Sequence, residues 1–324
     1  INPEQFAAKT FTKDQQALRY QKMLLETFML NIRNLSKTYD NGVKALNGVS
    51  LDIEPGLFGL LGPNGAGKSS LMRTIATLQL PTHGQISFDN KDIIKNPNIL
   101  RSCLGYLPQE FGVYPKVSCY QLLEHMALLK GVTNHKQRKA QIEQLLHQTN
   151  LHDVRKKDVS SFSGGMRQRF GIAQALLGAP KLVIVDEPTA GLDPYERNRF
   201  HNLLCEIGEN VVVILSTHIV EDVSQLCPNM AILAQGQVQL TGKPHQLVKS
   251  IEGTLWGKVV EKSQVAGYQA KFDVISEQLI TGKTQLIVQS EFQPEIGFEP
   301  VTPNLEDVYF STLHQLKKGE THDL

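Results

Sequence analysis

The stretch Gly62-Pro63-Asn64-Gly65-Ala66-Gly67-Lys68-Ser69 decides the fold. It matches G-x-x-x-x-G-K-[ST], a pattern whose glycines let successive backbone N–H groups point at phosphate oxygens. The apolar run Leu57–Leu61 precedes it and a helical pattern, Ser69–Leu78, follows it. A strand, a glycine-rich loop and a helix in this order predict a nucleotide-phosphate site at the positive pole of the helix. The eight residues and the adjoining Ser70 are candidate phosphate-binding residues.

Two carboxylates at the end of a second apolar strand extend this chemistry. Asp186 and Glu187 directly follow the run Lys181–Val185. Unpaired charges at the end of a buried strand are costly to desolvate, but beside a phosphate loop they have a use. Lys68 can reach the β- and γ-phosphates, and the Ser69 hydroxyl with Asp186 can hold Mg²⁺. Glu187 can accept a proton from an attacking water.

Strand and helix patterns alternate along most of the chain, which predicts an α/β fold with a mainly parallel sheet. Two strands before the phosphate loop, Leu30–Leu35 and Val43–Ile53, flank the turn signal Asp40-Asn41-Gly42 and predict an antiparallel β subdomain. Later strands are expected at 181–185, 211–215 and 230–233. Helices are expected at 117–130, 136–149, 166–177 and 194–207. The expected class is therefore a P-loop NTPase core with a helical insertion at about 110–177 and a small C-terminal α+β domain.

The domain boundaries are expected near residues 28 and 250. Residues 1–28 are interpreted either as a leader foreign to the chain or as a short helical extension. Residues 29–250 form the predicted nucleotide-binding domain. In residues 251–324, strands are expected at Thr254–Val260 and Gln285–Val288, and a helix at Leu305–Leu316.

Composition excludes several classes of protein. The chain has 324 residues, 41% of them hydrophobic, which suits a folded protein of about two domains. Lys+Arg is 33 and Asp+Glu is 32, so the formal net charge of +1 does not predict a nucleic-acid partner. The four cysteines form no C-x-x-C pair, which indicates reduced thiols and a cytosolic protein. The longest apolar runs are about five residues, against the roughly 20 that a spanning helix needs.

A second motif makes the family specific. Ser163-Gly164-Gly165-Met166-Arg167-Gln168-Arg169, followed by the stretch 186–194 (DEPTAGLDP), resembles the ATP-binding subunit of an ABC transporter across about 29–247. The resemblance implies that Tyr39 stacks on adenine and that Gln109 contacts Mg²⁺ and the attacking water. It also implies that Ser163, Gly164 and Gly165 bind the γ-phosphate of ATP held by the opposite subunit. Asp193 then lies in the loop 191–193 that crosses the dimer interface, and His218 is the switch histidine.

Two of these assignments have a structural alternative. Tyr39 could be a strand aromatic packed beside the hairpin, and a lone histidine at a strand end, such as His218, is usually structural. The signature departs from the usual family pattern at Phe162 and Met166, where Leu and Gln are common. The Met variant, and more weakly the segment Pro303–Tyr309, resemble exporters of the drug, haem and polysaccharide groups.

The resemblance implies an ATPase that uses Mg²⁺, closes as a head-to-tail dimer of two copies, and drives transport, in the direction of export, through a separate polytopic membrane partner. Its expected location is the cytoplasmic face of the membrane. The alternative is a soluble ABC ATPase acting on ribosomes or DNA. Against that alternative, the gap Ser70–Phe162 is too short for a long coiled coil, and the chain carries a single set of motifs.

Overall fold

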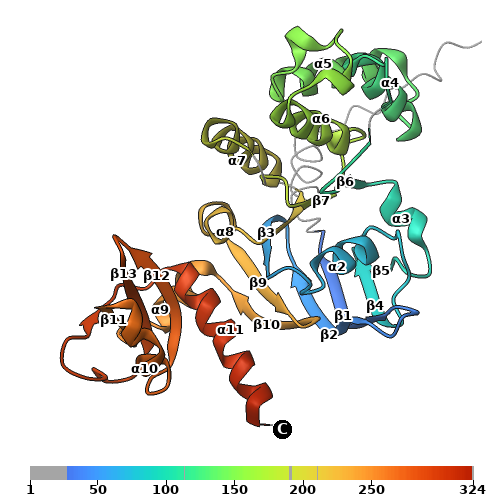
Figure 1. Cartoon of the computed structure of the whole chain (residues 1–324). Helices are drawn as coiled ribbons and strands as arrows, with labels where there is room; N and C mark the ends of the chain where they lie inside the picture. Colours follow the sequence, from blue (N-terminus) through green and yellow to red (C-terminus); the bar gives the residue numbers. More distant parts are fainter. Residues whose placement is uncertain (1–27, 113, 190–191, 210, 323–324) are drawn as a thin grey trace, which may run out of the picture.

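The structure, a computed structural model, describes residues 28–112, 114–189, 192–209 and 211–322. The predicted N-terminal extension, residues 1–28, lies outside these ranges apart from Phe28, and its nature stays a prediction. The described chain forms three sheets with helices on and between them (Figure 1). The predicted α/β P-loop class is confirmed by the sheet at its centre.

The central sheet has the strand order β10-β9-β3-β8-β7-β6, in which β10 alone is antiparallel to its neighbour. Its members are β3 (Gly56–Leu61), β6 (Leu104–Leu107), β7 (Leu182–Asp186), β8 (Val212–Thr217), β9 (Asn229–Ala234) and β10 (Gln237–Gly242). Every residue of β7 and β8 is buried. Parallel strands covered on both faces carry continuous apolar runs, which is why the sequence located these strands.

An antiparallel sheet covers one face of the core, in the order β2-β1-β4-β5. Its strands are β1 (Leu30–Thr38), β2 (Lys44–Ile53), β4 (His83–Phe88) and β5 (Lys91–Asp92). The hairpin predicted between β1 and β2 is confirmed, since Tyr39 N donates to Val43 O at 2.9 Å. One apolar cluster, which includes Ile32, Phe58 and Met72, packs this sheet, the central sheet and α2 (Lys68–Ile75) together.

Helices cover the rest of the central sheet and form the insertion. The predicted helix after the phosphate loop ends at Ile75 rather than Leu78, because Thr77 takes a left-handed conformation with φ of 59°. The other helices up to residue 226 are α3 (Pro97–Arg101), α4 (Cys119–Leu129), α5 (His135–Gln148), η1 (His152–Val154), η2 (Val159–Ser161), α6 (Gly164–Leu176), α7 (Pro194–Gly208) and α8 (Val220–Leu226). Helices α4 to α6 form a separate lobe with its own apolar cluster (Figure 1).

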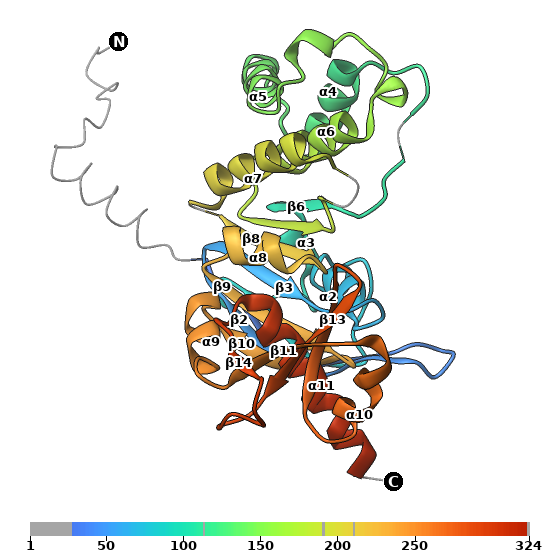
Figure 2. The same ribbon diagram turned by 60° about the vertical axis from the view of Figure 1, so that its left-hand side comes forward.

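The C-terminal part carries a third sheet, in the order β12-β13-β11-β14. Its elements are α9 (Pro244–Ser250), β11 (Leu255–Val260), η3 (Lys262–Gln264), α10 (Val265–Gln269), β12 (Val274–Ile280), β13 (Lys283–Gln289), β14 (Glu299–Pro300) and α11 (Leu305–His322). Helix α11 returns to the core, where Leu305, Val308 and Tyr309 join the apolar cluster that contains Val223 of α8 (Figure 2). The domain boundary near residue 250 stays a prediction. None of the described helices is long and apolar enough to cross a membrane.

Candidate active site

Four of the predicted site residues follow four neighbouring parallel strands. Lys68 lies beyond β3, His218 beyond β8, Glu187 beyond β7 and Gln109 beyond β6, and these strands are adjacent in the order β3-β8-β7-β6. The carboxyl ends of parallel strands share one edge of the sheet, where α/β proteins bind their ligands. The topology thus gathers side chains that are up to 150 positions apart in the sequence (68 to 218).

Glu187 is the centre of this group. Its carboxylate lies 3.1 Å from His218 Nδ1, 3.5 Å from Gln109 Nε2 and 3.7 Å from Lys68 Nζ. The residue adopts a left-handed conformation with φ of 50°, which is unfavourable for any residue with a side chain. Its N–H donates to Ser216 O at 2.8 Å, and its side chain is 12% exposed. Backbone strain of this kind is concentrated at functional sites. Here the left-handed conformation places the carboxylate at the edge of the sheet.

Lys68 is held inside the loop that precedes it. Its ammonium group donates to Gly62 O at 2.6 Å and to Pro63 O at 3.2 Å, and the residue is 5% exposed. Burial lowers the pKa of the Lys68 amine, and the neighbouring carboxylates of Glu187 and Asp186 partly offset that shift. The amine is therefore a desolvated donor within reach of the loop, the position that a phosphate-binding lysine requires.

The loop itself needs glycine at residue 67. Gly67 has φ of 102°, and a Cβ at this position would lie 2.3 Å from Ala45 O. The close approach of β2 to the loop therefore excludes a side chain. It also brings β2 residues into the wall of the site, a consequence that the motif alone does not indicate.

The loop opens into a cavity of about 890 Å³. The predicted residues that line it are Tyr39, Pro63, Asn64, Gly65, Ala66, Gly67, Lys68, Ser69, Ser70, Gln109, Glu187 and His218. The remaining wall, which sequence reasoning missed, consists of Val43, Lys44, Ala45, Gln235 and Gly236. Gln235 and Gly236 form the β9–β10 turn and both have positive φ values, 52° and 73°.

Tyr39 lies at this cavity beside the start of α2. Its hydroxyl is 3.0 Å from Ser70 Oγ and donates to Gln79 Oε1 at 3.2 Å. These contacts fix the ring relative to the phosphate loop. Stacking of this ring on adenine stays a prediction, since the ring is partly exposed and equally suits the packing role.

The surroundings of Asp186 show whether this site suits a Mg²⁺ ion. The residue is 4% exposed, and its Oδ1 has no hydrogen-bond partner. Burial raises the pKa of the Asp186 carboxyl, and the neighbouring Ser216 and Ser69 hydroxyls and the Lys68 ammonium offset this only in part. A buried carboxylate oxygen without a donor is what a cation would satisfy, and Mg²⁺ prefers oxygen ligands. The residues present therefore fit the predicted metal.

The signature residues lie elsewhere. Ser163 caps α6 by accepting a hydrogen bond from Met166 N at 3.3 Å, and Ser163 and Gly164 are exposed. Neither these residues nor Gly165 line the phosphate cavity. Asp193 caps α7 through Glu196 N at 2.9 Å and is also exposed, whereas Gly191 lies outside the described residues. Within one chain, the signature is therefore not part of the phosphate site.

Gln109 lies between the two sites. It lines the phosphate cavity and also a second hollow of about 380 Å³, shared with Gly164 at the start of α6. Phe111 and Leu192 line the same hollow. The segment after Gln109 is thus in contact with both the core and the insertion, as its position in the sequence predicts.

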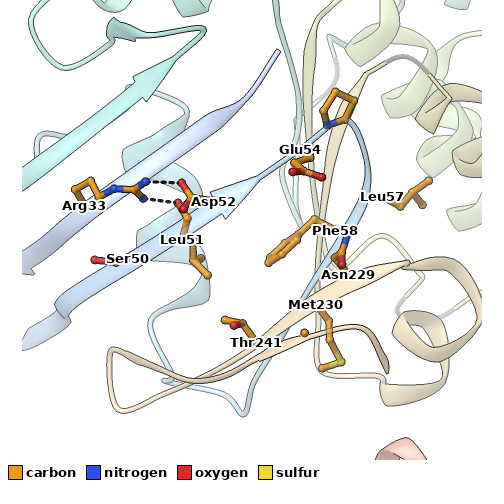
Figure 3. A pocket seen from close by; sticks show the side chains of 12 residues that line it. Arg33, Ser50, Leu51, Asp52, Glu54, Leu57, Phe58, Asn229, Met230 and Thr241 are labelled. Carbon is orange, nitrogen blue, oxygen red and sulfur yellow. Dashed lines mark hydrogen bonds and ion pairs between the residues drawn. The ribbon is translucent and has the colours of Figure 1, made fainter. Parts of the chain in front are cut away.

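A further cavity, of about 420 Å³, lies between the antiparallel sheet and the β9–β10 side of the core (Figure 3). The exposed ion pair of Arg33 and Asp52, 2.7 Å apart, lines one side, and Phe58 and Met230 line another. None of the predicted site residues lines this cavity, so it carries none of the predicted chemistry.

Four polar side chains, of which only Thr189 belongs to a quoted motif, form a network centred on a buried carboxylate next to the site. Asp222 of α8 is fully buried and accepts hydrogen bonds from Thr189 Oγ1 at 2.5 Å, Arg197 Nε at 2.8 Å and His201 Nε2 at 2.9 Å. Burial pushes the pKa of the Asp222 carboxyl up, but the hydrogen bonds from His201, Thr189 and Arg197 outweigh it and leave that pKa below its usual range. The network joins the segments that follow Glu187 and His218. The sequence offered one signal for this network, which is the acidic Asp222 beside the apolar Val223. The structure shows that Val223 is buried.

We expect Asp222→Ala to lower the free energy of unfolding by about 3–5 kcal/mol, because it leaves buried donors without a partner. Urea unfolding followed by circular dichroism measures this. The matched control is Glu221→Ala, whose carboxylate pairs with Arg197 at 3.3 Å but is 63% exposed, and which should cost no more than about 1 kcal/mol. Equal effects of the two variants would contradict a structural role specific to the network.

The contribution of Asp222 should also depend on pH. Its pKa is lower in the folded chain than in the unfolded chain, so its stabilisation is complete at neutral pH and is lost as the pH falls from about 4 through the folded-state pKa. The difference in stability between the wild type and Asp222→Asn, measured by urea unfolding at each pH, should accordingly shrink as the pH falls below about 4.

Comparison with known proteins places this geometry in a family. The model of the family described as ABC transporter matches residues 46–190. The chain is 30% identical to an uncharacterized ABC transporter ATP-binding protein, YxlF of Bacillus subtilis, over 88% of this chain and 100% of that protein. It is also 30% identical to Nod factor export ATP-binding protein I of Rhizobium etli, over 86% and 92% of the two chains.

Longer relatives match over part of their length. The chain is 33% identical to a probable multidrug ABC transporter ATP-binding protein, YbhF of Escherichia coli, and spans 46% of it. Among solved structures, the dimeric MJ0796, a bacterial ABC transporter cassette, superimposes with a TM-score of 0.61 at 26% identity, over 66% of this chain and 98% of that chain.

Proposed function

Because the chain belongs to the family of ABC transporter ATP-binding proteins, we propose that it powers export through a separate membrane-spanning partner. As a member of this family it is an ATPase that binds and hydrolyses ATP. The observation that supports the ATP chemistry on which this proposal depends is the contact of Glu187 with Lys68, Gln109 and His218 at one edge of the parallel sheet.

In the proposed mechanism, the phosphate loop binds ATP through its backbone N–H groups and Lys68. Ser69, Gln109 and Asp186 would hold Mg²⁺, which when bound neutralises charge on the β- and γ-phosphates. Glu187 accepts a proton from the attacking water. His218 and Gln109 orient this carboxylate from two sides, at 3.1 and 3.5 Å. Tyr39 is proposed to hold adenine.

We propose that two copies of the chain complete the site. Ser163 and Gly164 are exposed and absent from the phosphate cavity of their own chain, so they are free to face ATP bound by a second copy. The exposed N-terminus of α6 has a positive pole and first-turn N–H groups without an intrahelical acceptor, both suited to a γ-phosphate. Asp193 would lie at the same interface. A two-fold head-to-tail dimer with two ATP molecules satisfies both copies.

The membrane partner is proposed to contact the helical insertion. Tyr114, Leu128 and Leu129 of this lobe are large apolar residues with 61%, 45% and 72% of their surface exposed. Large exposed apolar side chains mark interaction sites when they lie together, and Leu128 and Leu129 are adjacent at the end of α4. Such a partner would hold the chain at the cytoplasmic face of the membrane. The direction of export rests on the Met166 variant of the signature and on relatives with export and multidrug names.

The test is a purification of the tagged protein from detergent-solubilised membranes, with the co-purifying chains identified by mass spectrometry. We expect a stoichiometric polytopic membrane protein. Its loss in a Leu129→Asp variant that retains ATPase activity would locate the contact on the insertion, and Val259→Asp, at a residue 54% exposed on β11, is the control. Recovery with ribosomal or DNA-bound proteins alone would contradict the transport proposal and leave the ATP chemistry intact.

A further inference from the structure

Three metal-ligating side chains meet on the helical insertion, away from the phosphate cavity. Glu143 and His147 are four residues apart on α5 and therefore share one face of the helix. His152, the first residue of η1, folds back onto that face. One ligand atom of each residue lies within 4.8 Å of the others. We propose that this cluster binds a divalent transition-metal ion of the zinc class.

The backbone fixes His152 independently of its side chain. After α5 the chain turns at Asn150, which has φ of 53°, and Leu151 is fully buried with its N–H donating to Leu146 O at 2.8 Å. The carbonyl of His152 accepts a hydrogen bond from Arg155 Nη1 at 2.7 Å. The three ligands are thus brought together by the fold, which reduces the ordering cost of binding an ion.

The side-chain geometry suits a metal ligand. His152 Nε2 lies 3.3 Å from Glu143 Oε2, and His152 Nδ1 lies 3.4 Å from Asp153 Oδ1. Metal-binding histidines commonly donate the N–H of one ring nitrogen to a carboxylate while the other nitrogen binds the ion. His147 stacks on His152 with ring centroids 4.0 Å apart, and it is exposed, so its ring can rotate to direct a nitrogen at the same point.

The chemistry of the cluster selects the metal. Two imidazoles and one carboxylate are a zinc donor set that leaves a fourth position for water. Mg²⁺ prefers oxygen ligands, so this site is distinct from that of the ATP-associated ion. The charged groups in contact with His152 are the carboxylates of Glu143 and Asp153 and the guanidinium of Arg155, which is 3.4 Å from His152 Nδ1. Their sum is negative when the imidazoles are neutral, which favours a cation.

The experiment is a calorimetric titration of the tag-free, nucleotide-free full chain with Zn²⁺. We expect one high-affinity ion per chain and a rise in thermal stability on binding, since the ion binds the folded state. The variants His147→Asn and Glu143→Gln alter exposed or partly exposed side chains, so they should fold, and each should weaken binding by at least about 10-fold. The control is His135→Ala, an exposed histidine at the start of the same helix and outside the cluster.

Two results would overturn the assignment. One is a wild-type chain that takes up no Zn²⁺. The other is unchanged affinity and stoichiometry in both His147→Asn and Glu143→Gln, which would place the bound ion at other histidines or at the exposed Cys205. Circular dichroism of each variant, recorded without metal, establishes that a loss of binding is not a loss of folding. ATPase activity is not needed for any of these measurements, so they stand apart from the proposed transport function.

Discussion

Replacement of Glu187 by glutamine will reduce ATP turnover by about 10²- to 10⁴-fold, the range that a positioned general base contributes. Glutamine keeps the size of the side chain and its contacts with Gln109 and Lys68, but it cannot accept a proton from water. ATP binding should therefore persist, and ATP should accumulate on a closed dimer that no longer opens by hydrolysis. Phosphate release measures the first effect, and size-exclusion chromatography with ATP measures the second.

The control for this variant is Glu252→Gln, which removes the same charge from an exposed residue after α9. It should turn over ATP at the wild-type rate. Normal turnover in Glu187→Gln would remove the general-base role from this residue. Loss of ATP binding in that variant would instead show that the carboxylate acts mainly through Lys68, which lies 3.7 Å away.

The strands of the central sheet that sequence reasoning located share one physical property. Strands β3, β7, β8 and β9 are buried on both faces and read as apolar runs, and the glycine-rich loop is read from the spacing of its residues. Several of the missed elements lack such a pattern. Strand β4 is exposed over its first three residues, and α3 and β5 are only five and two residues long.

The site was predictable to the extent that its residues belong to motifs. The strand order brings Lys68, Gln109, Glu187 and His218 together, and no local pattern reports that order. The wall at Ala45 and Gly236 depends on a contact between β2 and the β9–β10 turn, where Asn47 N donates to Gly236 O at 2.8 Å. Contacts between residues so far apart in the sequence follow from packing, which local patterns do not encode.

The second large effect is expected at the phosphate loop. Lys68→Ala should weaken ATP binding by about 10- to 150-fold, because a hydrogen bond to a charged group contributes about 1.5–3 kcal/mol and each 1.4 kcal/mol is about tenfold. The lysine is buried beside two carboxylates, so its removal also leaves their negative charge facing the phosphates. Equilibrium binding of a fluorescent ATP analogue measures the loss. Lys249→Ala, at an exposed residue of α9, is the control, and unchanged affinity in Lys68→Ala would contradict the loop assignment.

Lys68→Ala, combined with a second variant, Ser163→Phe, tests whether each site needs two chains. Ser163→Phe blocks the exposed start of α6 without touching the phosphate cavity of its own chain, so it should bind ATP but fail to hydrolyse it. In a head-to-tail dimer, a Lys68→Ala copy paired with a Ser163→Phe copy has one site with both defects and one with neither. At an ATP concentration too low to occupy Lys68→Ala, mixing the two proteins should therefore restore activity, up to about a quarter of the wild-type rate, since about half of random pairs are mixed. Wild-type turnover by Ser163→Phe alone would place the whole site within one chain, because the signature would then contribute nothing across the interface.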